Sequence, residues 1–315
     1  MFGGARVLIT GGSGSFGTAF TKYLLTQGVE RVVCLSRSEH KQAEMERQFN
    51  DDRLRLIIGD VRDRDRLDMA FRGVDIVIHA AALKRVEKGE TDPDEFVKTN
   101  VGGAMNVIRA AIDNRVNRVV ALSTDKAASP ITAYGACKLC AEKLFLTAHT
   151  YVPRDYPTQF AVTRYGNVMG SAGSVIPLFR ELVGQNKPLK LTDRQATRFW
   201  MHMDEAVDLV ANTVKRMRGG ELFVPKLPSF KVEDLAFAIA GYQYVPGITT
   251  IGMRGVEKTH ESLLSVDEGR NASDCGDVYA LGLRGTPMPP GWSYSSDNNP
   301  HFLTRDDITE RLKVT

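Results

Sequence analysis

The alternation of strand-like and helix-like segments constrains the fold of this 315-residue chain more than any other feature of its sequence. Short runs rich in β-branched residues predict strands, and amphipathic stretches between them predict helices. Strand and helix in this rhythm predict an α/β fold with a doubly wound parallel sheet. The expected strands are Arg6–Thr10, Arg31–Leu35, Leu54–Gly59, Asp75–His79, Val119–Ser123 and Gln159–Arg164. The expected helices include Phe16–Gln27, Glu39–Gln48, Glu95–Asn114 and Thr132–His149.

A glycine-rich turn follows the first expected strand and opens the first expected helix. Its G-x-x-G-x-x-G spacing is a variant of the dinucleotide-binding fingerprint of Rossmann-type sheets. Such glycines permit a tight turn, bring backbone N–H groups close to a pyrophosphate and let the helix pack on the sheet. The contacts that we expect with a dinucleotide come from Gly11, Gly14, Ser15, Phe16 and Gly17.

The end of the second strand bears on the choice between NAD and NADP. An acidic residue about 20 positions after the glycines favours NAD. Here the strand ends in Ser36 and Arg37, and Lys41 follows one turn into the next helix. A serine and two cations suit a 2′-phosphate, so NADP is favoured over NAD. A surface charge at the start of a helix is the alternative interpretation of Arg37.

The ends of the third and fourth strands complete the expected cofactor site. Asp60 and Val61 are expected at the adenine, whereas Ala80 and Ala82 have small side chains where the backbone must approach the cofactor. Lys84 follows immediately and points either toward the nicotinamide end or a substrate phosphate, or it is an exposed loop lysine.

The alternation loosens after residue 165, which predicts two structural units. Residues 1–165 are expected to form the NADP-binding domain, to which residues 200–225 return, with Glu221–Pro225 as one further strand. Residues 166–199 and 226–315 are expected to form a smaller substrate lobe over the carboxyl ends of the strands, where ligands bind in open α/β sheets.

Two acid/base pairs follow the fifth strand. Tyr134 and Lys138 are four residues apart, so they share one face of a helix. Moving a tyrosine pKa from about 10 to near neutrality needs roughly 4 kcal/mol. One cation at about 4 Å in a half-buried site supplies roughly that much, so Tyr134 is a candidate base. Asp125 and Lys126 add a second pair, which indicates a reaction that moves a hydride and also breaks another bond; a surface turn is the alternative.

Composition excludes several classes of protein. The net charge is +3 with both signs interspersed, and the RDRDR run at 62–66 is better explained as a solvated helix start than as a nucleic-acid site. No apolar run approaches the roughly 20 residues of a membrane helix, so we expect a cytoplasmic protein. Cys137 and Cys140 form a lone C-x-x-C inside an expected helix, and we expect no metal there.

The glycine spacing and the Tyr-x-x-x-Lys pair resemble the extended short-chain dehydrogenase/reductase superfamily. Within it, the chain from about residue 5 to its C-terminus resembles the inverting UDP-N-acetylglucosamine 4,6-dehydratases of pseudaminic acid biosynthesis. Membrane-anchored relatives usually have methionine where Tyr134 stands, so the chain resembles the soluble branch. The narrower motifs that carry this resemblance are Ser123-Thr-Asp-Lys-Ala127, Arg164-Tyr-Gly-Asn-Val-Met-Gly-Ser171, Thr197-Arg-Phe-Trp200, Phe223-Val-Pro-Lys226 and Tyr294-Ser-Ser-Asp-Asn-Asn-Pro-His301.

The resemblance implies a lyase that oxidises C4 of UDP-N-acetylglucosamine, eliminates water across C5–C6 and returns the hydride to C6. Tyr134 would take the proton of the 4-hydroxyl, which Thr124 hydrogen-bonds. Lys138 would lower the pKa of Tyr134 and hold the nicotinamide ribose. Lys126 would remove the C5 proton, and Asp125 would protonate the departing 6-hydroxyl. Retaining dehydratases generally have glutamate at position 126, so the lysine implies inversion at C5 and an L-arabino product.

The resemblance also implies substrate contacts and a homo-oligomer, either a dimer or a hexamer. Each contact residue taken alone could instead be a surface or interface residue. The family usually has Arg-Pro-Gly-Glu-Lys-Leu-His-Glu where this chain reads Arg254-Gly-Val-Glu-Lys-Thr-His-Glu261, so the loop departs from the pattern. The residues expected at the UDP-sugar are Lys84, Asn167, Ser171, Arg198, Arg254 and Glu257.

Three other functions fit parts of the pattern. A UDP-sugar 4-epimerase needs only Tyr134, Lys138 and Thr124, and the Asp125–Lys126 pair argues against it. A retaining 4,6-dehydratase of the same superfamily differs at C5. A non-catalytic dinucleotide sensor would be expected to lack the Tyr/Lys pair.

Overall fold

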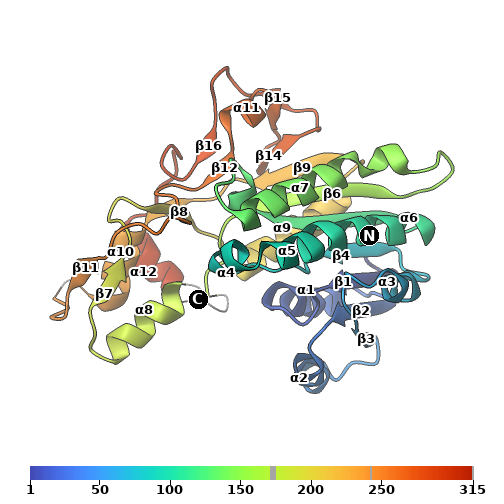
Figure 1. Cartoon of the computed structure of the whole chain (residues 1–315), viewed down its shortest axis with the longest axis horizontal. Coiled ribbons are helices and arrows are strands. Elements are labelled where there is room, and N and C mark those ends of the chain that lie inside the picture. The colour runs from blue at the N-terminus through green and yellow to red at the C-terminus, as the bar shows by residue number, and fades with distance from the viewer. Residues whose placement is uncertain (171–174, 242, 314–315) are drawn as a thin grey trace.

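A large twisted sheet with helices on both faces stands beside a smaller lobe in the computed structural model, which describes residues 1–170, 175–241 and 243–313 (Figure 1). Among the described residues, the sheet has ten strands in the order β15-β13-β14-β9-β6-β5-β4-β1-β2-β3. Its parallel part consists of β1 (Arg6–Thr10), β2 (Arg31–Ser36), β3 (Leu54–Ile58), β4 (Ile76–His79), β5 (Arg118–Thr124), β6 (Gln159–Tyr165) and β9 (Glu221–Pro225). The predicted doubly wound sheet, including the returning strand 221–225, is therefore confirmed.

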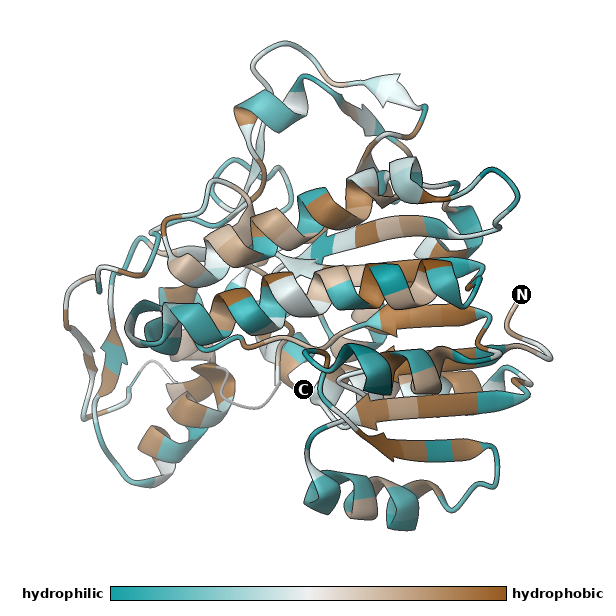
Figure 2. Ribbon diagram, turned by 45° about the vertical axis from the view of Figure 1, so that its right-hand side comes forward, coloured by the Kyte–Doolittle hydropathy of each residue, from teal (hydrophilic) through white to brown (hydrophobic). Residues whose placement is uncertain are grey.

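Helices cover both faces of the parallel strands. Helices α3, α6 and α7 form one continuous layer, while α1 and α9 contact each other on the opposite face (Figure 1). Figure 2 shows the strands as hydrophobic between these layers, as expected for a parallel sheet that is buried on both sides. The helices are α1 (Ser15–Thr26), α2 (Glu39–Phe49), α3 (Arg64–Phe71), α4 (Val86–Thr91), α5 (Pro93–Phe96), α6 (Gly103–Asp113), α7 (Ala133–Thr147) and α9 (Met203–Arg216).

The expected single helix 95–114 is interrupted. Between α5 and α6 the backbone forms a π-helical segment, Val97–Gly102. Within it, the buried Asn100 donates to the carbonyl of Leu83 (2.9 Å) and accepts from the N–H of Leu83 (2.8 Å). A side chain that holds another segment on both sides explains why the helix widens here, where the sequence pattern alone predicts a regular helix.

The smaller lobe has its own apolar core and lies beside the carboxyl ends of the parallel strands (Figure 1). Trp200, Phe230, Leu235 and Ile308 are buried in that core. Its elements are α8 (Val175–Gly184), β7 (Leu189–Leu191), β8 (Thr197–Phe199), β10 (Ser229–Lys231), α10 (Val232–Ala240), β11 (Ile248–Thr250) and α12 (Arg305–Leu312).

The boundary expected at residue 226 differs from the structure, because part of the C-terminal region joins the large sheet. Strand β14 (Val278–Leu281) pairs antiparallel with β9, so it covers an edge that β9 would otherwise leave open. Strands β13 (Ala272–Asp274) and β15 (Thr286–Pro287) continue the sheet beyond β14. Helix α11 (Val266–Gly269) precedes them, and β12 (Ser262–Leu264) pairs with β16 (Tyr294–Ser295).

No helix in the described part of the chain combines the length and the apolar character that a membrane span requires.

Candidate active site

The glycine turn joins β1 to α1 at the carboxyl edge of the sheet. Gly11 has φ +71°, and a Cβ there would lie 2.9 Å from Ala81 Cα. A residue with a side chain is therefore excluded by both conformation and space. Gly14 is the N-cap of α1 and has no side chain with which to cap it, so backbone N–H groups of the first turn are available to an anion. The turn has the form required to bind a pyrophosphate.

The other predicted residues of this turn belong to α1. Ser15 is exposed as its first residue, and Gly17 is buried against the turn. Phe16 stacks on Phe20, with ring centroids 5.4 Å apart. The phenyl ring of Phe16 therefore packs within the protein, which leaves its backbone as the group to meet a ligand.

The residues expected at the adenosine end meet where β2 and β3 end. Asp60 accepts two hydrogen bonds from the Arg62 guanidinium (3.0 and 2.7 Å), and Arg37 Nη1 lies 3.9 Å from the same carboxylate. Burial alone would raise the pKa of Asp60, but the Arg62 contacts and the Arg37 charge hold it below its usual value. Arg37 and Lys41 are exposed.

Ser36 lies deeper than the sequence suggests. Its buried hydroxyl accepts hydrogen bonds from Ser13 Oγ (2.9 Å) and from Gln42 Nε2 (2.9 Å). Only the hydrogen of its own hydroxyl remains to be donated. Ser36 therefore ties the glycine turn to α2, a role that local sequence did not predict.

The segment after β4 is held in place from two sides. The N–H of Ala80 donates to the carbonyl of Thr10 (3.1 Å), and the N–H of Ala81 donates to its hydroxyl (3.3 Å). The side chain of Asn100 hydrogen-bonds to the N–H and the carbonyl of Leu83. Lys84 is exposed in the loop that leads to α4.

The second acid/base pair forms a short turn at the end of β5. The hydroxyl of Thr124 donates to Asp125 Oδ1 (2.8 Å), and Lys126 Nζ donates to the same oxygen (3.0 Å). Asp125 is buried, and a Cβ at Gly166 would lie 3.3 Å from its Oδ2. The glycine after β6 thus leaves room for the carboxylate.

Helix α7 begins beside this turn because three groups fix its N-terminus. Thr132 Oγ1 accepts from the N–H of Gly135 (3.1 Å), and Glu90 Oε1 accepts from the N–H of Ala133 (2.8 Å). Gly135 packs against the carbonyl of Lys126, so a larger residue would push α7 away from the turn. Tyr134 is thereby brought to the Asp125–Lys126 pair.

Tyr134 and Lys138 are both buried, but their electrostatics differ from the expectation. Burial raises the pKa of Tyr134 above its ordinary value, although the Lys126 charge and a hydrogen bond to Thr124 oppose the rise. Lys138 Nζ donates to the carbonyl of Leu122 (2.6 Å). Burial, partly offset by Glu142, lowers the pKa of Lys138 to about 8. In this structure the cation that acts on the phenol is therefore Lys126 rather than Lys138.

Two charged residues that sequence reasoning did not single out complete the site. Glu261 Oε1 lies 3.4 Å from Lys126 Nζ. Arg164, fully buried on β6, donates to Glu142 of α7 (2.9 Å) and to Glu268 of α11 (2.9 Å). Arg164 begins one of the motifs that carry the family resemblance, and Glu261 ends the segment 254–261 that was compared with the family pattern. These positions are the sequence signal that could have identified the two residues.

The residues expected at the substrate lie around the same edge. Asn167 is exposed just after β6, and Ser171 lies outside the described residues. Arg198 is turned toward backbone carbonyls, those of Thr197 (2.7 Å), Thr259 (2.9 Å) and Lys258 (3.0 Å). Its guanidinium therefore orders the segment that carries Glu261.

Arg254 and Glu257 form an ion pair on the lobe. Arg254 Nε donates to Glu257 Oε1 (3.0 Å), and its Nη1 donates to Glu87 Oε1 of α4 (3.1 Å). Lys258 Nζ donates to the carbonyl of Ala128 (2.8 Å). These contacts hold the lobe segment 254–261 over the turn that follows β5.

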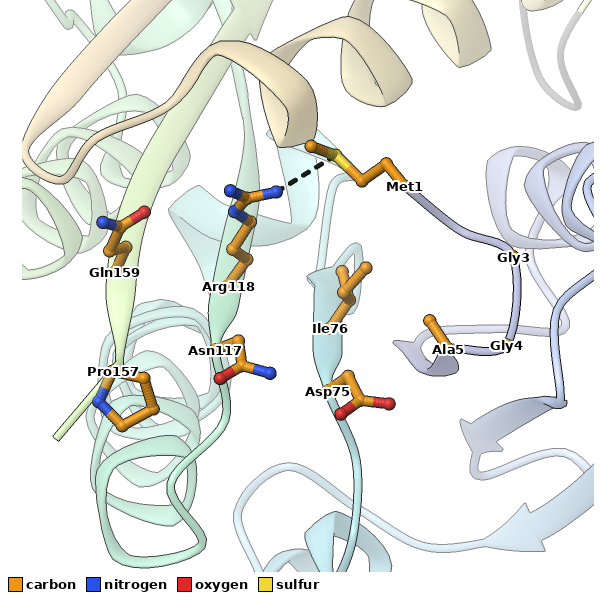
Figure 3. Close-up of a pocket in the computed structure, with 10 residues that line it drawn as sticks. All are labelled: Met1, Gly3, Gly4, Ala5, Asp75, Ile76, Asn117, Arg118, Pro157 and Gln159. Carbon is orange, nitrogen blue, oxygen red and sulfur yellow. Dashed lines mark hydrogen bonds between the residues drawn. The ribbon is translucent and has the colours of Figure 1, made fainter.

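A separate pocket of about 520 Å³ lies at the opposite edge of the sheet (Figure 3). It is lined by residues at the amino ends of the strands, among them Ala5, Asp75, Asn117 and Gln159. Ligands of open α/β sheets bind at the carboxyl ends, where the acid/base residues are. We therefore place the functional site at the carboxyl edge. No cluster of metal-binding side chains occurs in the described ranges.

Comparison with known proteins identifies the family of the chain. A family model described as a polysaccharide biosynthesis protein matches residues 7–282. The chain is 43% identical to a Campylobacter jejuni protein named "UDP-N-acetylglucosamine 4,6-dehydratase (inverting)", over 100% of the chain and 99% of that protein. It is 44% identical to a Rickettsia bellii "UDP-glucose 4-epimerase", over 91% of the chain and 86% of that protein. The crystal structure of Pen from Bacillus thuringiensis is 34% identical, with a TM-score of 0.93 over 100% of this chain and 98% of Pen.

Proposed function

The chain belongs to the polysaccharide biosynthesis protein family, and we propose that it is an inverting UDP-N-acetylglucosamine 4,6-dehydratase that uses NADP. One observation carries the proposal beyond the superfamily. The Asp125–Lys126 pair is joined to Tyr134 through Thr124 at the carboxyl end of β5. An oxidation at C4 needs only Tyr134, Lys138 and Thr124, whereas loss of the 6-hydroxyl needs an additional acid and base.

The first step is the oxidation at C4. The form of the glycine turn supports binding of a dinucleotide pyrophosphate, and Lys138, buried on α7, would bind the nicotinamide ribose. When bound, the dinucleotide supplies a hydride acceptor that later acts as the donor, so no external reductant is consumed. Tyr134 takes the proton of the 4-hydroxyl, assisted by the positive charge of Lys126.

The elimination step requires a proton to move within the Asp125–Lys126 pair. As the structure stands, the Asp125 carboxylate accepts two hydrogen bonds and Lys126 is the donor in one of them. Transfer of one proton across their 3.0 Å contact produces a neutral amine and a carboxylic acid. The amine removes the C5 proton, which the new 4-ketone has acidified, and the acid protonates the departing 6-hydroxyl. The pair returns to its ionised state and water leaves.

The stereochemistry depends on which face of C5 receives the final proton. Once C6 has been reduced, a proton from solvent that reaches C5 on the face opposite Lys126 would give the L-arabino sugar. Lysine at position 126, where retaining enzymes of the superfamily generally have glutamate, supports inversion.

The preference for NADP rests on the charges at the end of β2. Asp60 is hydrogen-bonded to Arg62 and only 3.9 Å from Arg37 Nη1, and both Arg37 and Lys41 are exposed, so one carboxylate faces three cations and net positive charge is left for a 2′-phosphate. Denaturing the purified protein and identifying any released nucleotide by mass spectrometry tests this preference. Release of NAD alone would refute it.

An epimerase is the second candidate, because the chain is 44% identical to the Rickettsia protein over 91% of its length, against 43% to the Campylobacter protein over its full length. Proton NMR with UDP-N-acetylglucosamine in deuterated water separates the two. A new C6 methyl signal with deuterium at C5 and L-arabino couplings supports the proposal. D-xylo couplings would indicate a retaining dehydratase, and a galacto epimer without a methyl signal would indicate the epimerase.

A further inference from the structure

Lys126 lies between two carboxylates rather than one. Its Nζ donates to Asp125 Oδ1 at 3.0 Å and lies 3.4 Å from Glu261 Oε1. Asp125 is its neighbour in the chain, whereas Glu261 comes from the C-terminal region, directly before β12. A single ammonium between two carboxylates is held more strongly than one that pairs with either alone.

The backbone of Glu261 is fixed on both sides. Its N–H donates to Ser296 Oγ (3.0 Å), and its carbonyl accepts from the N–H of Ser296 (2.8 Å). Ser296 Oγ in turn lies 2.7 Å from the hydroxyl of Thr197. The backbone that carries the carboxylate is therefore held next to the paired strands β12 and β16, since Glu261 directly precedes β12 and Ser296 directly follows β16.

The burial of the Glu261 carboxylate is energetically unfavourable. Only 5% of the side chain is exposed, and its Oε2 has no hydrogen-bond partner among the described residues. A buried carboxylate oxygen without a donor is unfavourable, so a carboxylate is kept at this position against a cost in stability. The charge itself is then the property that matters.

We propose that Glu261 is a positioning residue that keeps one proton on the Asp125–Lys126 pair, an inference that rests on the dehydratase function proposed above. The active pair holds a single proton, carried by Lys126 at rest and by Asp125 after the internal transfer. Loss of this proton to solvent would leave a carboxylate and an amine, with no acid for the departing 6-hydroxyl. The negative charge of Glu261 opposes that loss.

The charges around Lys126 favour its protonated form, as this role requires. Burial alone would lower the pKa of Lys126, but Asp125 first and Glu261 second raise it above its ordinary value. Tyr134 also faces Lys126, while Lys258 and Arg198 add positive charge nearby, with Arg198 Nε 3.9 Å from Glu261 Oε1. Removing the charge of Glu261 leaves these cations opposed by Asp125 alone, so the proton on Lys126 should be lost at lower pH.

The first test does not depend on substrate. The titration of Lys126 is followed by carbon NMR on lysine-labelled protein, with Lys126→Arg to assign the signal. Glu261→Gln should lower the pKa of Lys126 by one unit or more, a tenfold or larger change in the proton equilibrium. Asp267→Asn, which removes an exposed carboxylate from α11, should leave the titration unchanged. An unshifted pKa in Glu261→Gln would refute the inference whether or not the protein is a dehydratase.

The second test uses the reaction. In Glu261→Gln the alkaline limb of the kcat profile should move to lower pH with KM little changed, and Glu261→Asp should restore part of the difference. A uniform loss of kcat at every pH, with the limb in place, would show that Glu261 is only structural. If the wild-type protein forms no 6-deoxy product while the NMR shift is present, the proposed function fails and the proton-retaining role of Glu261 stands.

Discussion

Replacing Arg164 by methionine is expected to destabilise the protein by about 3–5 kcal/mol, the range for breaking a buried ion pair by removal of one partner. Arg164 and Glu142 each have 1% of the side chain exposed. The guanidinium uses all of its N–H groups, on Glu142, Glu268 and the carbonyl of Leu263. Methionine fills a similar volume but leaves the Glu142 carboxylate buried and unpaired.

Thermal unfolding measures the loss. A 315-residue chain has an unfolding entropy of about 0.66 kcal/mol/K, so the midpoint should fall by about 5–8 °C. Arg164→Met with Glu142→Leu removes the two fully buried charges and leaves Glu268, whose side chain is 16% exposed, so it should recover part of the loss. Arg6→Met, which breaks an exposed pair with Glu30, should cost about 1 kcal/mol or less. The reasoning fails if the single variant loses less than the Arg6 control, or if the double variant is no more stable than the single one.

Three further predictions concern the site. Lys126→Met should slow C4 oxidation, seen as reduced cofactor by absorbance near 340 nm, because the charge that acts on the Tyr134 phenol is lost, and it should reduce C6-methyl formation by about a further hundredfold. Tyr134→Phe should lose both, and equal loss of both in Lys126→Met would contradict the assigned roles. Arg37→Ala should weaken the affinity for NADP relative to NAD by about tenfold in a binding titration, because one charge-assisted contact to the 2′-phosphate is lost. An unchanged ratio of the two affinities would contradict the role of Arg37. Burial, partly offset by Glu142, lowers the pKa of Lys138 from 10.5 to about 8. Between these two pH values the unfolded chain binds more protons than the folded one, so the free energy of unfolding should rise with pH. Chemical denaturation across that window should show this rise in wild type but not in Lys138→Met, and parallel curves would contradict it.

Much of the cofactor half of the molecule could be predicted from sequence. The strands of the parallel sheet begin and end close to the predicted residues, since a run of β-branched residues between turn signals is a local pattern. The glycine turn was predictable for the same reason, because the order strand, glycines, helix is visible within a dozen residues. The turn 124–126 and the helix with Tyr134 and Lys138 also lie close together in the chain.

Other features required the folded chain. Glu268 is 104 residues from the Arg164 that it pairs with, and no periodicity relates them. Strands β13–β15 were expected in the lobe, but β14 joins the large sheet because β9 presents an open edge. Asn100 interrupts an expected helix because its side chain binds a segment that the local pattern does not include.

The sequence by itself determined which chemical groups the site contains, because the glycine turn, the Asp125–Lys126 pair and the Tyr134–Lys138 pair are each local patterns. Only the tertiary structure decided how these groups are charged. Lys138 Nζ donates a hydrogen bond to the carbonyl of Leu122. Lys126 faces the phenol of Tyr134 and lies 3.4 Å from the carboxylate of Glu261. Burial and the distance between charges control the protonation of each group, and both are set when distant segments of the chain pack together.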